Sequence, residues 1–165
     1  MAFPKEIHSR ALLISFLITI AGSGVFICNV SSSDISHSGI VTVTNETRYF
    51  TQHPDVKPTV FKKEYYAKGN ILFTCGERID GDILLTTLME ETEYTRDEDV
   101  EIVLKYPASG YKGYDISYVS IYAYVSTTAA DTYFVDGGIR QSYAEILMVA
   151  NQTSNFGFQI YIYGY

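Results

Sequence analysis

The chain of 165 residues is 47% hydrophobic and 19% charged, a balance that fits a folded domain and excludes a disordered polar chain. Its formal net charge of −7 argues against direct binding to nucleic acids, because proteins that contact the phosphate backbone carry a basic face. Two cysteines and three histidines leave little from which a disulfide scaffold or a zinc site could be built.

The first predicted element is a secretory signal. Lys5 and Arg10 precede an uncharged run, ALLISFLITIAGSGVFICNV, that has small residues in its second half. A basic start, an apolar run and small residues are the layout of a signal peptide. We predict a signal over residues 1–28, cut between 24 and 33, and hence a secreted, extracellular protein that no membrane retains. An uncleaved anchor is the alternative, because an apolar run of about 20 residues can span a bilayer.

Sequons begin at Asn29, Asn45 and Asn151, and together they agree with a secretory route. We predict N-glycosylation at Asn45 and Asn151, which have turn-like surroundings, and name Asn29 as a third acceptor that the nearby apolar run would hinder. The cleavage site also decides the state of the cysteines. A cut after Cys28 leaves Cys75 as a lone, buried thiol, which we favour, whereas an earlier cut permits a Cys28–Cys75 disulfide.

Residues 29–69 are predicted to form an N-terminal arm. They contain Pro54 and Pro58, two of the four prolines in the chain, together with many polar residues. The segment IVTVT at 40–44 alternates, and we expect it to add one edge strand to the domain that follows.

Residues 70–165 are predicted to form a β domain, because apolar and polar side chains alternate along them. From Ser117 to Val125 the odd positions are mostly aliphatic and the even positions mostly tyrosine, and residues 156–165 repeat that plan. Turn signals separate further strands, which we predict over residues 71–75, 79–88, 100–106, 132–135 and 143–150. Seven or eight short strands of this kind predict an all-β fold, either an antiparallel β-sandwich or a barrel.

A tight turn is predicted at Asp80-Gly81-Asp82, since aspartate caps its own backbone and glycine accepts a positive φ. Asp82 would share a side of its strand with Leu84, so we expect its carboxylate to be partly buried and hydrogen-bonded. A carboxylate pair for acid–base or metal chemistry is the alternative interpretation.

An acidic segment joins two of the predicted strands. Its members are Glu90, Glu91, Glu93, Asp97, Glu98, Asp99 and Glu101. Residues 86–95 are the one candidate helix, but contiguous acids fit a solvated loop better, and such a loop could meet a basic partner. A weak calcium site is the alternative, although the spacing matches no EF-hand loop.

Tyrosine is the outlier of the composition, with 15 residues in a chain that has no tryptophan. Five of them fall on one side of two predicted strands: Tyr118, Tyr122, Tyr124, Tyr161 and Tyr163. If the two strands are neighbours, these rings form a continuous surface, which we name the tyrosine face and predict to bind a protein or a glycan. The plainer explanation is that tyrosine simply favours strands.

Catalytic motifs are absent from the sequence, which has no GxSxG, no phosphate-binding glycine loop and no cysteine with an evident histidine partner. His37 and His53 lie in the arm, and we expect His53, which precedes Pro54 in a loop context, to be solvated rather than a base or a ligand. We therefore predict a protein that is not an enzyme and that uses no cofactor and no metal.

Five segments of the C-terminal part resemble the insect multiprotein bridging factor two family. They are GERIDGDILL at 76–85, VLKYP at 103–107, DISYVSIY at 115–122, DGGI at 136–139 and GFQIYIYG at 157–164. Their order and spacing agree from about residue 69 to the C-terminus. The chain departs from the family in its arm and in a glycine-rich run that is reduced to Gly137 and Gly138.

This resemblance implies two different functions. The family is named after a coactivator that links a nuclear-receptor-type activator to general transcription factors, yet many members resemble secreted proteins of haemolymph or salivary gland. Because of the predicted signal, our main hypothesis is a secreted, glycosylated, non-catalytic binding module for an unidentified protein or glycan. The alternative is a nuclear coactivator whose acidic surface meets basic partners, although the sequence contains no basic run typical of nuclear import.

Overall fold

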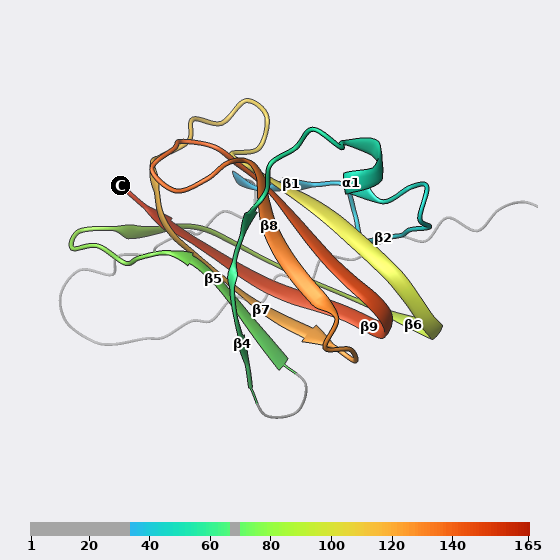
Figure 1. The fold of residues 1–165 in the computed structure, drawn as a ribbon. Helices are drawn as coiled ribbons and strands as arrows, with labels where there is room; N and C mark the ends of the chain where they lie inside the picture. The colour runs from blue at the N-terminus through green and yellow to red at the C-terminus, as the bar shows by residue number, and fades with distance from the viewer. Residues whose placement is uncertain (1–33, 67–69) are drawn as a thin grey trace, which may run out of the picture.

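The computed structural model describes residues 34–66 and 70–165 (Figure 1). This part of the chain forms one antiparallel sheet of nine strands and a helix of four residues, and the sheet does not close into a barrel. The predicted all-β class is therefore confirmed. None of the described helices is long and apolar enough to cross a membrane. The predicted signal segment, Asn29 and Cys28 lie outside the described residues.

The elements follow one another in chain order. They are β1 (Ser36–His37), β2 (Val41–Thr42), α1 (Tyr49–Gln52), β3 (Thr59–Val60), β4 (Lys62–Tyr65), β5 (Asn70–Gly76), β6 (Ile83–Tyr106), β7 (Ile116–Val125), β8 (Ala130–Gly137) and β9 (Ala144–Gly164). The strands predicted at 71–75, 117–125 and 132–135 are confirmed as β5, β7 and β8. The edge strand expected within 40–44 is β2, which pairs with β6.

Two strands are far longer than predicted, because pairs of segments that we separated by loops are continuous. β6 has 24 residues and β9 has 21, and they pair with each other in both halves, from one end to the other. The prediction of an acidic loop is therefore wrong, since the acidic segment is the middle of β6. Register shifts after Glu93 and after Glu98 disrupt the pairing there, and such bulges let a strand bend without ending.

The bend folds the sheet into two layers. Both β6 and β9 turn back at the same end of the molecule, near their labels in Figure 1. In the first layer the C-terminal half of β9 lies between β6 and β7, and β5 and β4 follow. In the second layer the N-terminal half of β9 lies between β6 and β8, with β1 and β2 on the far side of β6 and β3 beyond β8.

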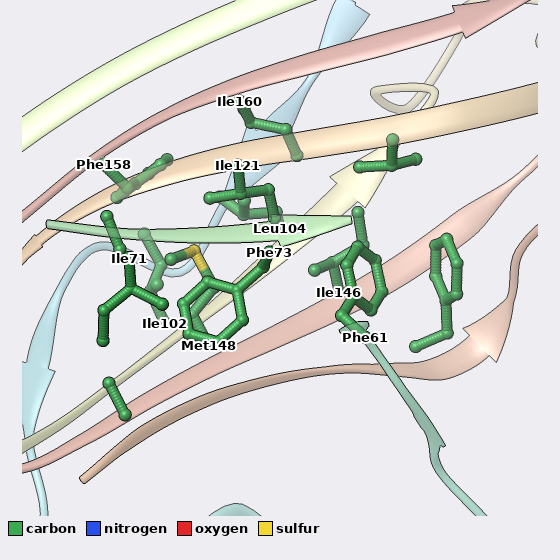
Figure 2. Close-up of a cluster of buried hydrophobic side chains, with 14 of the residues drawn as sticks. Phe61, Ile71, Phe73, Ile102, Leu104, Ile121, Ile146, Met148, Phe158 and Ile160 are labelled. Atoms are coloured by element: carbon green, nitrogen blue, oxygen red, sulfur yellow. The ribbon is translucent and has the colours of Figure 1, made fainter. Parts of the chain in front are cut away.

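The hydrophobic core fills the space between the layers (Figure 2). The first layer contributes Ile71, Phe73, Ile121, Phe158 and Ile160, and the second contributes Ile102, Leu104, Ile146 and Met148. Phe61, between β3 and β4, is also buried in it. Since side chains alternate along a strand, burial of these positions directs their neighbours, including the tyrosines of β7 and β9, to the outer faces.

The outer face of the second layer is covered by α1. The ring of Phe50 packs edge-on against Tyr133, with centroids 5.2 Å apart, and the backbone N–H of Tyr49 donates to Glu101 Oε2 at 2.8 Å. Leu147 pairs with Tyr133 on that face and is fully buried. No described element covers the first layer in this way, so its outer face is open.

Candidate protein-binding face

The tyrosine face exists as one continuous surface on the outer side of the first layer. β7 and β9 are antiparallel neighbours, and their register places Tyr118 opposite Tyr163. The ring centroids of that pair are 6.1 Å apart, and those of Tyr122 and Tyr161 are 6.2 Å apart at an interplanar angle of 87°. The structure thus brings together all five tyrosines that the sequence singled out.

The rings are open to solvent to different degrees. Tyr122 is 41% exposed and Tyr124 is 37% exposed, whereas the other three tyrosines are half-buried among their neighbours. A shallow depression of about 310 Å³ runs between them, lined by Ser120, Tyr122, Tyr124, Gln159, Tyr161 and Tyr163. Met89 of β6, which pairs with Gln159, extends this surface and is 67% exposed. Sequence reasoning missed Met89, because only the pairing of β6 with β9 places it here.

Two phenol groups of the face, those of Tyr118 and Tyr161, act as neutral polar groups. Burial raises the pKa of Tyr118 and of Tyr161, and neighbouring tyrosines raise it further. These two hydroxyls therefore stay protonated at physiological pH and can donate or accept hydrogen bonds. Rings of this kind offer apolar contact area, hydrogen bonds and π-faces, which is the chemistry of recognition.

An arginine closes one end of the face. The Cζ atom of Arg78 lies 3.7 Å from the ring centroid of Tyr163, and Arg78 Nε donates to Asp82 Oδ1 at 2.8 Å. Asp82 Oδ2 accepts from Ser117 Oγ at 2.7 Å. The Arg78 guanidinium holds the pKa of the Asp82 carboxyl well below its usual range, because both donors favour the charged form.

The predicted turn at Asp80-Gly81-Asp82 is confirmed. Gly81 has a φ of +85°, and the Asp82 side chain is almost fully buried and hydrogen-bonded as expected. Asp80 is exposed, so the two carboxylates do not face a common site.

The acidic residues of β6 divide into two groups. Four of them have partners, which are His37 for Glu90, Arg96 for Glu98, Arg48 for Asp99, and the Tyr49 backbone with Arg48 for Glu101. The other three, Glu91, Glu93 and Asp97, are exposed and form no ion pair with a described residue. Within 34–66 and 70–165, no three His, Cys, Asp or Glu side chains gather in a group that could hold a metal.

Other predicted positions lie away from the tyrosine face. Asn45 is exposed in a turn, and the side-chain oxygen of Asn151 accepts a hydrogen bond from Arg48 Nη1 at 2.8 Å. Their glycosylation stays a prediction. Cys75 is free in the described chain and half-buried rather than buried, and burial raises the pKa of its thiol.

Comparison with known protein families gives one match. The model of a family described as transcription activator MBF2 matches residues 75–164, which run from the end of β5 to the end of β9. The comparisons with curated proteins and with solved structures give no significant match. All five tyrosines of the tyrosine face and the acidic residues of β6 lie inside the matched region.

The match confirms the resemblance seen in the sequence and corrects the main functional hypothesis. A secreted, non-catalytic binding module was our first interpretation, and a match to a family of transcription activators contradicts it. We had preferred a secreted protein to a coactivator because of the predicted signal. A pattern of charge and hydropathy in a terminal segment does not indicate what the folded domain does. The match instead supports the alternative, a nuclear role in transcription.

Proposed function

Because the chain belongs to the MBF2 transcription activator family, we propose that it acts in the nucleus as a transcriptional coactivator. In this role it would bind a nuclear-receptor-type activator and general transcription factors at the same time. The observation that carries the proposal is the family match, which spans β6, β7, β8 and β9. A coactivator of this kind performs no catalytic step and depends on contacts between proteins.

The tyrosine face is the surface that we assign to one of these partners. Tyrosines are enriched where proteins meet, since a ring gives a large contact area with few rotatable bonds and the hydroxyl finds hydrogen bonds. The strands beneath the rings pair along their length, so the surface is rigid before a partner arrives. A preformed surface loses less conformational entropy on binding than a mobile one.

The charge of the chain supports a role that is exerted through proteins. A net charge of −7 repels the phosphate backbone of DNA, so the activator would supply the contact with the promoter. The exposed carboxylates of Glu91, Glu93 and Asp97 would attract basic partner surfaces over distances of about 10 Å.

A reporter assay tests the proposal. Full-length chain is expressed in cells that carry a reporter gene under a nuclear-receptor-type activator, and reporter output is compared with and without the chain. We expect output to rise only when the activator is present. The double variant Tyr122→Ser with Tyr161→Ser should remove the rise.

The matched control is Tyr111→Ser with Tyr114→Ser, two exposed tyrosines of the loop between β6 and β7. This control should behave as the unaltered chain does. If the unaltered chain leaves reporter output unchanged in the presence of the activator, the coactivator proposal is wrong. If both double variants still raise output, the function stands and the tyrosine face is not the surface that serves it.

A further inference from the structure

The tyrosine face already binds one cation of its own chain. The Arg78 guanidinium lies over the ring of Tyr163, with its Cζ atom 3.7 Å from the ring centroid, well within the range of a cation–π contact. Its positive charge is balanced by the Asp82 carboxylate beside it. One ring of the face, with one carboxylate at its side, thus forms a binding site for a guanidinium group.

The same combination recurs further along the face, without a cation. Tyr122 and Tyr124 are exposed, and Tyr161 stands almost perpendicular to Tyr122 at the depression between the strands. Among the described residues, the only cations over aromatic rings are Arg78 and Lys63, and Lys63 lies over Tyr65 and Phe73. The π-faces at the depression are therefore available to a cation from outside.

A carboxylate for this second position comes from β6. Glu91 pairs with Gly157 of β9, and Gly157 pairs in turn with Tyr124 of β7, so the three residues form one row across the outer face. A Cβ atom at Gly157 would lie 3.1 Å from the Cγ atom of Glu91, which shows that the Glu91 side chain leans over this glycine. Because neighbouring strands are about 4.8 Å apart, Glu91 and Tyr124 stand about 10 Å apart at the backbone, a gap that a long cationic side chain fills.

We propose that the depression of the tyrosine face binds the arginine or lysine side chains of a basic protein segment, with Glu91 and Glu93 balancing their charge. The occupant is a partner protein and not a second copy, because two chains of net charge −7 would bring carboxylates together. That the partner is a transcription protein rests on the proposed function. The chemistry of the site rests only on the contacts described above.

Binding of a synthetic peptide to the full chain tests this inference. The probe is a short dye-labelled peptide in which arginine alternates with valine, and fluorescence anisotropy measures its affinity. A peptide with glutamate in place of arginine serves as the charge control. We expect the basic peptide to bind, the acidic peptide not to bind, and added salt to weaken the interaction.

Variants locate the site and identify the contact. Tyr122→Leu, which removes the ring but keeps apolar bulk, and Glu91→Gln should each weaken binding about three- to tenfold, whereas Tyr122→Phe should bind nearly as the unaltered chain does. Tyr111→Leu and Glu46→Gln change an exposed tyrosine and an exposed acid elsewhere and should have no effect. Tyr122 and Glu91 are exposed, so these variants should fold normally.

Three results would overturn the inference, namely no binding of the basic peptide, equal binding of the acidic peptide, or equal affinity in Tyr122→Leu and the unaltered chain. None of them bears on the reporter assay, which tests the coactivator function without assuming what the face binds. Conversely, the chain could bind the basic peptide at this site and never raise reporter output. That result would support the inference and contradict the proposed coactivator function.

Discussion

His37 Nε2 lies 3.0 Å from Glu90 Oε1, and this contact joins β1 of the second layer to β6 of the first. The backbone N–H of Gly39 donates to His37 Nδ1 at 3.2 Å, so Nε2 carries the proton and donates it to the carboxylate. Both side chains are about one-third exposed or less. The contact therefore links the two layers at the edge of the first layer that β6 forms.

Breaking this tie should cost a modest amount of stability. We expect a double-mutant cycle of His37→Ala and Glu90→Ala to give a coupling free energy of about 0.5–1.5 kcal/mol, as for a hydrogen bond to a charged group in partial solvent. Urea unfolding of the four proteins measures it. The matched control is the exposed pair of Lys62 and Glu64 within β4, whose coupling should stay below about 0.5 kcal/mol. Equal coupling free energies in the two cycles would show that the contact between His37 and Glu90 stabilises the fold no more than an exposed ion pair does.

The alternation along β7 predicts opposite results for two adjacent residues. Ile121 is fully buried between the layers, so Ile121→Ala should lower the free energy of unfolding by about 2–5 kcal/mol through lost contacts and a cavity. Tyr122 points outward, and Tyr122→Ala should cost about 1 kcal/mol or less, the worth of a cross-strand pair. Urea denaturation compares the two. Should Tyr122→Ala prove as costly as Ile121→Ala, the tyrosine face would be part of the core and could not be a binding surface.

This alternation is also why the tyrosine face could be predicted from the sequence. The side-chain period of a strand is a local property, so Tyr118 and Tyr122 were placed on one side of β7 without any knowledge of the fold. Their meeting with Tyr161 needed one further fact, that β7 and β9 are neighbours, and strand order depends on the whole chain. The positions of Met89 and Arg78 on this face also depend on the strand order, and no local pattern in the sequence predicts them.

The length of β6 and β9 was hidden for a related reason. A run of acids such as Asp97, Glu98 and Asp99 interrupts the alternation of apolar and polar residues. The sequence looks the same whether the chain leaves the sheet at this point as a loop or bends within the sheet as a continuous strand. Here the bend occurs opposite Gln152, which has a φ of +53° and donates its backbone N–H to Asp99 Oδ1 at 2.9 Å. Pairing with β9 on both sides of the bend, together with this contact to Asp99, keeps the chain in the sheet.

Two glycines with similar backbone angles should respond differently to alanine. Gly76 and Gly81 have φ values of +80° and +85°, so a side chain is strained at either position. A Cβ atom at Gly81 meets nothing within 4 Å, and Gly81→Ala should cost only the backbone strain, about 1–2 kcal/mol. At Gly76 the added atom would lie 2.2 Å from the backbone oxygen of Ser117, which cannot move without disturbing the pairing of β5 with β7.

We therefore expect Gly76→Ala to be several kcal/mol more costly than Gly81→Ala and to lower the yield of folded protein. Thermal unfolding followed by circular dichroism distinguishes the two variants. Similar melting temperatures for both would mean that the backbone at Ser117, near the start of β7, moves easily to make room for the added atom. In that case the rigidity assigned to the tyrosine face would be in doubt as well.

The ion pair at the end of the tyrosine face should make stability depend on pH. Arg78 and the hydrogen bonds from Ser117 and Ile79 lower the pKa of Asp82 in the folded chain. A carboxyl whose pKa is lower when folded stabilises the fold fully above its unfolded pKa of about 3.9, and this stabilisation is lost as pH falls toward the folded pKa. The pKa of Asp99 is lowered as well, chiefly by the side-chain hydrogen bond from Gln152, so it adds to the loss over the same acidic range.

Asp82→Asn isolates the contribution of Asp82. At neutral pH this variant should be clearly less stable than the unaltered chain, because Arg78 loses its counter-charge while Tyr163 still holds the guanidinium. As the pH falls below about 4 the deficit should shrink, because Asp82 takes up a proton in the unfolded chain before it does so in the folded chain, which removes the stabilisation that the unaltered chain gains from this charge. Urea midpoints measured from pH about 7 down to about 2 test this, with Asp80→Asn, an exposed acid of the same turn, as the matched control. A deficit that is the same at every pH would mean that the Asn variant fails through lost packing, and that the Arg78–Asp82 charge pair does not hold this end of the face.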